Sequence, residues 1–144
     1  MTPETAVPTV TAPSNDAGRE AFQWLRVLFT GAPILVGLMK FTDLVDWTVY
    51  LWSGVTDLLP VSGQQIMLAV GVVEIIAGLL VAVRPRIGAY VVAGWLGTVI
   101  VNLLLVGGFY DVVVRDVGLL VAALVLGRLA GTYGARPSVV RAGR

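Results

Sequence analysis

The sequence contains no cysteine and no histidine. Without cysteine the chain can form no disulfide bond, no thiolate nucleophile and no iron–sulfur centre. Without histidine it lacks the usual ligands of zinc sites and of bis-histidine haem. We therefore expect no metal site and no resident cofactor. A redox role would need a diffusible carrier such as a quinone, or a partner subunit.

Charged residues are scarce as well. They make up 13% of the 144 residues, whereas soluble domains average about 25%. Hydrophobic residues account for 57% of the chain, and its mean hydropathy is +0.87. One small domain cannot hide so much apolar surface from water, so we expect a lipid bilayer to surround most of it. The net charge of +1 gives no sign of nucleic-acid binding.

Four apolar runs are each long enough to cross a bilayer core of about 30 Å as a helix. They cover residues 22–41, 65–83, 87–106 and 112–130. Short polar turns join the second run to the third and the third to the fourth, which makes these helices antiparallel neighbours. We predict an all-α membrane protein, an antiparallel four-helix transmembrane bundle. The bundle occupies residues 19–132, between a disordered tail at 1–18 and a basic cytoplasmic tail at 133–144.

The loop between the first and second runs, residues 42–63, is too polar to cross the bilayer. Its acidic residues recur at helical spacing, and the aromatic side chains of Trp47 and Trp52 favour the membrane–water boundary. We predict a short amphipathic helix that lies in the interface and ends near Pro60. A re-entrant hairpin over residues 43–60 is the alternative.

The ten basic residues are divided unevenly between the two ends of the predicted helices. Eight lie at one end, and only Lys40 and Arg115 lie at the other. The positive-inside rule therefore predicts that both termini are cytoplasmic and that the first loop is outside. The predicted membrane anchors are Arg26, Trp47, Trp52, Arg84, Arg86 and Arg128.

Small residues recur at four-residue intervals in the third and fourth runs. Ala89, Ala93 and Gly97 form one such stripe, and Gly127 and Gly131 belong to another. Such stripes allow two helices to approach closely in lipid. They indicate either packing within the bundle or a contact between two copies of the chain, and the sequence leaves both open.

Glu74 lies near the middle of the second run, among valines and isoleucines. An ionisable group at that depth is costly unless it is paired or hydrated. It is therefore either functional, as a proton carrier or ligand contact, or structural, as part of a hydrogen bond between helices.

Arg115 and Asp116 are adjacent near the outer end of the fourth run. Because adjacent residues point about 100° apart on a helix, we expect each to pair with another helix. Together with nearby groups they predict a polar site in the outer half of the bundle. The alternative is that Lys40 and Arg115 extend to the interface. The predicted site contains Lys40, Asp43, Glu74, Asn102, Arg115 and Asp116.

Three motifs occur in a characteristic order. They are Arg26-x4-Gly31-x5-Gly37-x2-Lys40, then Gly71-x2-Glu74-x3-Gly78, then Arg115-Asp116. With this order the chain resembles, over residues 26–130, the DoxX-like family of small four-helix bacterial membrane proteins. The resemblance implies a multi-pass protein of the bacterial plasma membrane. One branch of that family is the small subunit of a thiosulfate:quinone oxidoreductase, and other members are linked to oxidative-stress assemblies.

These observations give three hypotheses about function. The first is a non-enzymatic accessory subunit of a membrane assembly, which uses the outer polar site to dock a protein partner or hold a small lipophilic ligand. The second is a quinone-linked oxidoreductase subunit, in which Arg115 or Lys40 holds a quinone oxygen and Glu74 handles protons. The third is a small proton-coupled transporter that uses Glu74.

Overall fold

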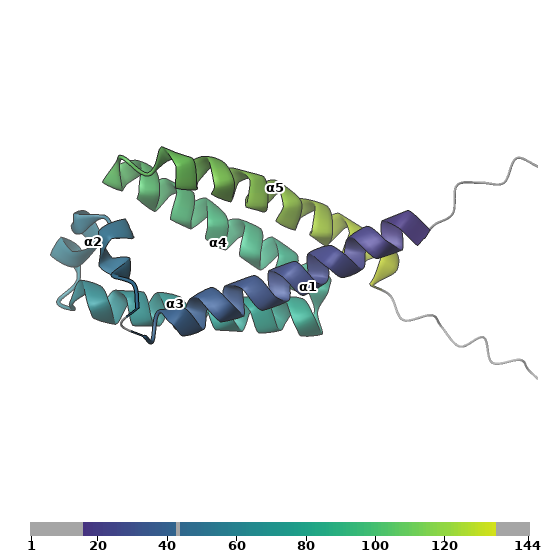
Figure 1. Cartoon of the computed structure of the whole chain (residues 1–144), viewed down its shortest axis with the longest axis horizontal. Coiled ribbons are helices and arrows are strands. Elements are labelled where there is room, and N and C mark those ends of the chain that lie inside the picture. The colour runs from purple at the N-terminus through teal and green to yellow at the C-terminus, as the bar shows by residue number, and fades with distance from the viewer. Residues whose placement is uncertain (1–15, 43, 135–144) are drawn as a thin grey trace, which may run out of the picture.

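A computed structural model of the chain describes residues 16–42 and 44–134. Every regular element among them is helical (Figure 1). The elements are α1 (Asp16–Met39), the 3-10 helix η1 (Trp47–Tyr50), α2 (Ser53–Leu58), α3 (Gly63–Val83), α4 (Pro85–Val106) and α5 (Tyr110–Tyr133). The long helices follow the four apolar runs, but each is extended by polar residues at one or both ends. In particular, α1 begins at Asp16, inside the segment predicted to be a disordered tail.

Local signals explain where the helices begin. Ser62 caps α3, because its hydroxyl accepts from the backbone N–H of Gln65 while the Gln65 side chain accepts from the backbone N–H of Ser62. Pro85 is the first residue of α4, where the backbone N–H that proline lacks would have no partner within the helix. As a result, Arg84 alone separates α3 from α4.

Three of the helices are long and apolar enough to cross a membrane. They are the segments Ala17–Met39, Gly63–Val83 and Pro85–Val106. The fourth long helix, α5, has 24 residues but carries four charged ones and is not among the three. Its crossing of the membrane stays a prediction.

The long helices pack as two pairs, α1 with α3 and α4 with α5, which also contact each other. Figure 1 shows that the pairs lie close together where α1 begins, α3 passes into α4, and α5 ends. We call this the closed end. The pairs diverge toward the opposite end, where α1 ends and α2 lies, and which we call the open end.

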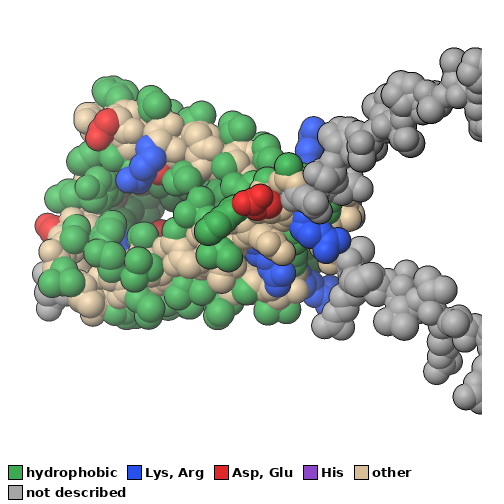
Figure 2. Space-filling model, turned by 45° about the vertical axis from the view of Figure 1, so that its right-hand side comes forward, with side chains coloured by type: hydrophobic (Ala, Val, Ile, Leu, Met, Phe, Trp, Pro, Cys, Tyr) green, Lys and Arg blue, Asp and Glu red, His purple; other side chains and the backbone are tan. Residues whose placement is uncertain are grey.

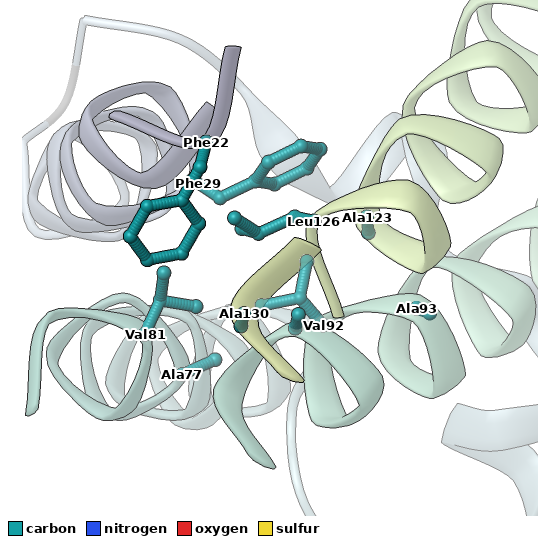
Figure 3. Close-up of a cluster of buried hydrophobic side chains, with 10 residues drawn as sticks. Phe22, Phe29, Ala77, Val81, Val92, Ala93, Ala123, Leu126 and Ala130 are labelled. Carbon is teal, nitrogen blue, oxygen red and sulfur yellow. The ribbon is translucent and has the colours of Figure 1, made fainter. Parts of the chain in front are cut away.

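Apolar packing is concentrated toward the closed end. Phe22 and Phe29 of α1 meet Val81 of α3, Val92 of α4 and Leu126 of α5 in one buried cluster (Figure 3). Val81 and Leu126 are fully buried. This cluster joins all four long helices and fixes how the two pairs meet.

Small residues bring the helices of each pair together. Gly37 and Gly71 lie back to back between α1 and α3, where a Cβ atom on Gly37 would lie 2.6 Å from the carbonyl oxygen of Gly71. Between α4 and α5, the predicted small residues Ala89 and Ala93 are buried, and Gly127 lies under the ring of Tyr90. These contacts are all within one chain, while a contact between two copies stays a prediction.

The loop between α1 and α3 differs from the single amphipathic helix that the sequence predicted. It contains two short helical segments, η1 and α2, because Leu51 and Trp52 between them are extended. At this break, Asn102 of α4 forms hydrogen bonds with the backbone of Tyr50 and Trp52. The interfacial location of the loop stays a prediction.

Candidate functional site

A cavity of about 600 Å³ lies between the two helix pairs, toward the open end. All four long helices contribute to its wall, and η1 and α2 complete it. The volume falls within the range of about 300–1,000 Å³ that is common for small-molecule sites. Most of the lining is apolar, with side chains such as Phe29, Val36 and Leu103. Figure 2 shows a hollow in this part of the molecule, with charged side chains near it.

A buried ion pair forms part of the cavity wall. Lys40 directly follows α1, and its Nζ atom lies 2.7 Å from Oε2 of Glu74 in α3. Their side chains are 5% and 14% exposed. The ring of Trp47 in η1 covers the ammonium group, with its centroid 4.3 Å from Nζ. Lys40 is thus held by a carboxylate and an aromatic face, which both stabilise a positive charge.

A second ion pair lies on α5. Nε of Arg115 donates to Oδ1 of Asp116 over 3.1 Å. We expected each of these adjacent residues to pair with another helix, and this contact shows that expectation to be wrong for the Arg115–Asp116 pair, because the long arginine side chain folds back along its own helix. The Asp116 side chain is buried, while that of Arg115 is 66% exposed. Both residues contribute to the cavity wall.

Asn102 of α4 attaches the loop to the bundle. Its Oδ1 atom accepts from the backbone N–H of Trp52 over 3.1 Å, and its Nδ2 atom donates to the carbonyl oxygen of Tyr50 over 2.6 Å. The Tyr50 ring also packs against Phe109, 4.8 Å away between ring centroids. The loop therefore covers the open end of the cavity from α3 to α4.

The structure brings most of the predicted site together. Lys40, Glu74, Asn102, Arg115 and Asp116 all contribute to the wall of one cavity, although they come from four different segments. Asp43 lies outside the described residues. Lys40 does not extend to the interface as the alternative required, since it is 4% exposed and bonded to Glu74.

The predicted membrane anchors occupy several kinds of position. Arg26 donates to the carbonyl oxygen of Ala82 in the last turn of α3, so it joins α1 to α3. Trp47 lies in the cavity wall. Arg84 is the residue between α3 and α4 at the closed end, and Arg86 is the second residue of α4. Arg128 is exposed on the last turns of α5.

Two features of the cavity were not predicted. Trp95 of α4 and Tyr50 of η1 contribute to its wall. Within the described part of the chain, the buried indole nitrogens of Trp47 and Trp95 have no hydrogen-bond partner. A signal existed for Trp95, because it lies in the middle of an apolar run, far from the boundary that tryptophan prefers.

The chemistry of the cavity comes from paired charges in an apolar space. Among residues 16–42 and 44–134, no group of three or more acidic side chains is placed to hold a metal ion. The wall offers one primary amine paired with a carboxylate, and one guanidinium paired with a second carboxylate. Comparisons of the chain with family models, with curated proteins and with solved structures gave no significant match.

Proposed function

We propose that the chain is an integral membrane protein that crosses the bilayer four times and holds a small lipophilic molecule in the cavity. It acts without catalysis of its own, as the ligand-holding subunit of a membrane assembly. The observation that carries this proposal is an apolar cavity of about 600 Å³ whose charged wall groups already have partners within the chain. Such a wall suits an apolar guest, since no unpaired charge has to be compensated.

Exposed apolar side chains support the membrane location. Large hydrophobic side chains face outward on every long helix, for example Leu35 at 61%, Val83 at 76% and Val114 at 73% exposure. Continuous apolar surface of this kind is unfavourable in water and favourable in lipid. The case for α5 as a fourth crossing is that Asp116, the deepest of its acidic groups, is buried and bonded to Arg115.

The orientation within the membrane follows from the basic residues, as the sequence indicated. Arg26, Arg84, Arg86 and Arg128 all belong to the half of the molecule that contains the closed end. The closed end is therefore cytoplasmic, and the cavity belongs to the outer leaflet. Membership of the DoxX-like family and a bacterial plasma membrane remain part of this proposal.

A cavity-filling substitution tests the proposal. Val70 of α3 contributes to the wall, and Val72 on the same helix is 44% exposed and lies outside it. We expect Val70→Trp to expel lipophilic molecules that copurify with the wild-type protein in mild detergent, and Val72→Trp to retain them. Mass spectrometry of organic extracts gives the measurement. Equal ligand content in all three proteins would overturn the proposal.

A quinone-linked role is the second candidate, favoured by the presence of Lys40 and Arg115 in the same wall. Both are hydrogen-bond donors of the kind that hold a quinone oxygen. This role predicts a bound quinone in the wild-type extract and slower quinone reduction after Glu74→Gln. A transporter role requires Glu74 to leave Lys40 in each cycle, and we do not favour it.

A further inference from the structure

Lys40 is the only lysine in the chain. The other nine basic residues are arginines, which suit charge pairing equally well but do not act as nucleophiles in proteins. Lys40 therefore carries the chain's single side-chain primary amine, and it lies in the cavity wall, where it is 4% exposed.

The surroundings of Lys40 combine an adjacent proton acceptor with an apolar cavity. Oε2 of Glu74 lies 2.7 Å from Nζ, within reach for direct proton transfer. Trp47 covers another side of the ammonium group and excludes water from it. The remaining wall is largely apolar. A lysine that passes its proton to an adjacent base becomes a neutral amine, which is the form that condenses with a carbonyl compound to a Schiff base.

The geometry points to a covalent site: we propose that Lys40 forms a Schiff base with a lipophilic aldehyde held in the cavity, with Glu74 as proton acceptor and then counter-ion. This inference rests on the proposed function, because the aldehyde's apolar tail must first enter the cavity. It goes further by assigning the ligand's reactive group and the atom that bonds to it.

The reaction balances without any further reactant. Glu74 takes a proton from the Lys40 ammonium, and the neutral amine attacks the aldehyde carbon to form a carbinolamine. The carbinolamine loses its hydroxyl group as water, and Glu74 returns the proton to the imine nitrogen. The net change is ammonium plus aldehyde to protonated imine plus water. Lys40 and Glu74 are both uncharged while Glu74 holds the proton, and the positive charge returns beside the Glu74 carboxylate when the imine nitrogen is protonated.

Reductive trapping tests this assignment on the intact chain in lipid nanodiscs. The protein is incubated with decanal and cyanoborohydride, digested and mapped by mass spectrometry. We expect a decyl group on Lys40, formed at least about tenfold faster than on the chain's own α-amino group, because the cavity holds amine and aldehyde together. Labelling of Lys40 that is absent, or no faster than that of the α-amine, overturns the inference.

Three variants separate a reactive lysine from a merely structural one. Val70→Trp fills the cavity and should reduce labelling of Lys40 without changing that of the α-amine. Glu74→Gln keeps a hydrogen-bond acceptor but cannot take up the proton, and should slow labelling by about 100-fold. Lys40→Arg preserves the charge and should show no adduct in the peptide that contains residue 40. Labelling at Lys40 that is unaffected by both Val70→Trp and Glu74→Gln counts against the site.

Binding of decanol distinguishes this inference from the proposed function. Decanol has the same tail but no carbonyl group, so it can occupy the cavity and cannot form an imine. If the wild-type protein binds decanol, Val70→Trp abolishes that binding, and decanal leaves Lys40 unlabelled, then the proposed function stands and the Schiff base is ruled out. If decanol does not bind and decanal does not label Lys40, both the proposed function and the Schiff base are ruled out.

Discussion

The two ends of the molecule solve the problem of joining helices in different ways. At the closed end, apolar side chains such as Phe29, Val81 and Leu126 interlock in one cluster. Toward the open end, the pairs are separated by a cavity, and polar contacts such as Lys40–Glu74 and Asn102 with its loop hold the parts in place. The chain therefore joins its helices by packing at the closed end and by specific polar bonds toward the open end.

This contrast has a physical basis in lipid. Apolar contacts between helices gain little from leaving lipid, so close packing must supply the stabilisation at the closed end. A cavity removes that packing. The Lys40–Glu74 pair in the cavity wall adds a directional link between α1 and α3, which also pack closely at Gly37 and Gly71.

We expect the largest loss of stability when one charge of the open half is left unpaired. Glu74→Ala leaves the buried Lys40 ammonium without its carboxylate, and we expect a loss of about 3–5 kcal/mol in the free energy of unfolding. SDS titration in mixed micelles gives the measurement. The double variant Lys40→Met, Glu74→Leu removes both charges and should recover most of this loss. A double variant as unstable as Glu74→Ala alone would show that the ion pair is not the cause.

We expect the second-largest loss of stability from a change to the apolar packing in the closed half. Leu126 is fully buried among all four long helices, so Leu126→Ala should cost about 2–3 kcal/mol through the void that it leaves. The same titration measures it. Val121→Ala is the matched control on α5, because Val121 is 54% exposed and its change should stay below about 0.5 kcal/mol. Equal losses for the two variants would remove the distinction between core and surface.

Breaking the link between the loop and the bundle should cost less free energy than either of these changes. Asn102→Ala removes both hydrogen bonds to the backbone of residues 50 and 52, at a cost of about 1–2 kcal/mol. We expect faster hydrogen exchange in η1 and α2, with exchange at the closed end unchanged. Thr98→Ala serves as the control, since the Thr98 hydroxyl bonds only to its own helix at Gly94. Uniformly faster exchange along the chain would mean that Asn102 supports the whole fold and not the loop alone.

The smallest effect concerns the start of η1. The hydroxyl and the backbone N–H of Thr48 both donate to the Asp46 carboxylate, and they lower the pKa of Asp46 from its ordinary value of 3.8. A lowered pKa means that the charged form stabilises the loop above pH 3.8, and that this contribution disappears as the pH falls through the lower, folded value.

Amide exchange at Thr48 measured across this acidic range should therefore increase as the pH falls, beyond the intrinsic change in rate. Asp46→Asn keeps the cap without a titrating group and should show no such increase. An Asn variant that follows the wild-type profile would assign the pH dependence to another group.

Hydropathy predicted the long helices well because length and apolarity are properties of each run by itself. The run at 65–83 became α3, Gly63–Val83, and the run at 87–106 became α4, Pro85–Val106. The pairing of helices was less accessible. Gly37 and Gly71 are both visible in the sequence, but nothing in either helix shows that these two glycines face each other.

The sequence predicted which polar residues belong to the candidate site, because each is costly to bury in lipid. It did not predict which of them bond to each other. Burial cost singled out Lys40 and Glu74 together, and the structure joins them. The Arg115–Asp116 contact was missed because helical spacing describes Cβ directions, whereas a long side chain can turn back. The division of the loop was missed because the side chain that bonds to its backbone at the break, Asn102, is 50 residues away from Trp52 in the chain.

Because Arg84 alone connects α3 to α4, a small change in the angle between these helices produces a larger displacement at their far ends. The helices α3 and α4 meet at Arg84 and extend about 30 Å toward the open end, at 1.5 Å per residue. A rotation of about 5° between them therefore moves their far ends apart by about 3 Å, by the same helix length. Small adjustments around Val81 and Val92 are thus magnified toward the open end. The packing at the closed end therefore controls the width of the cavity.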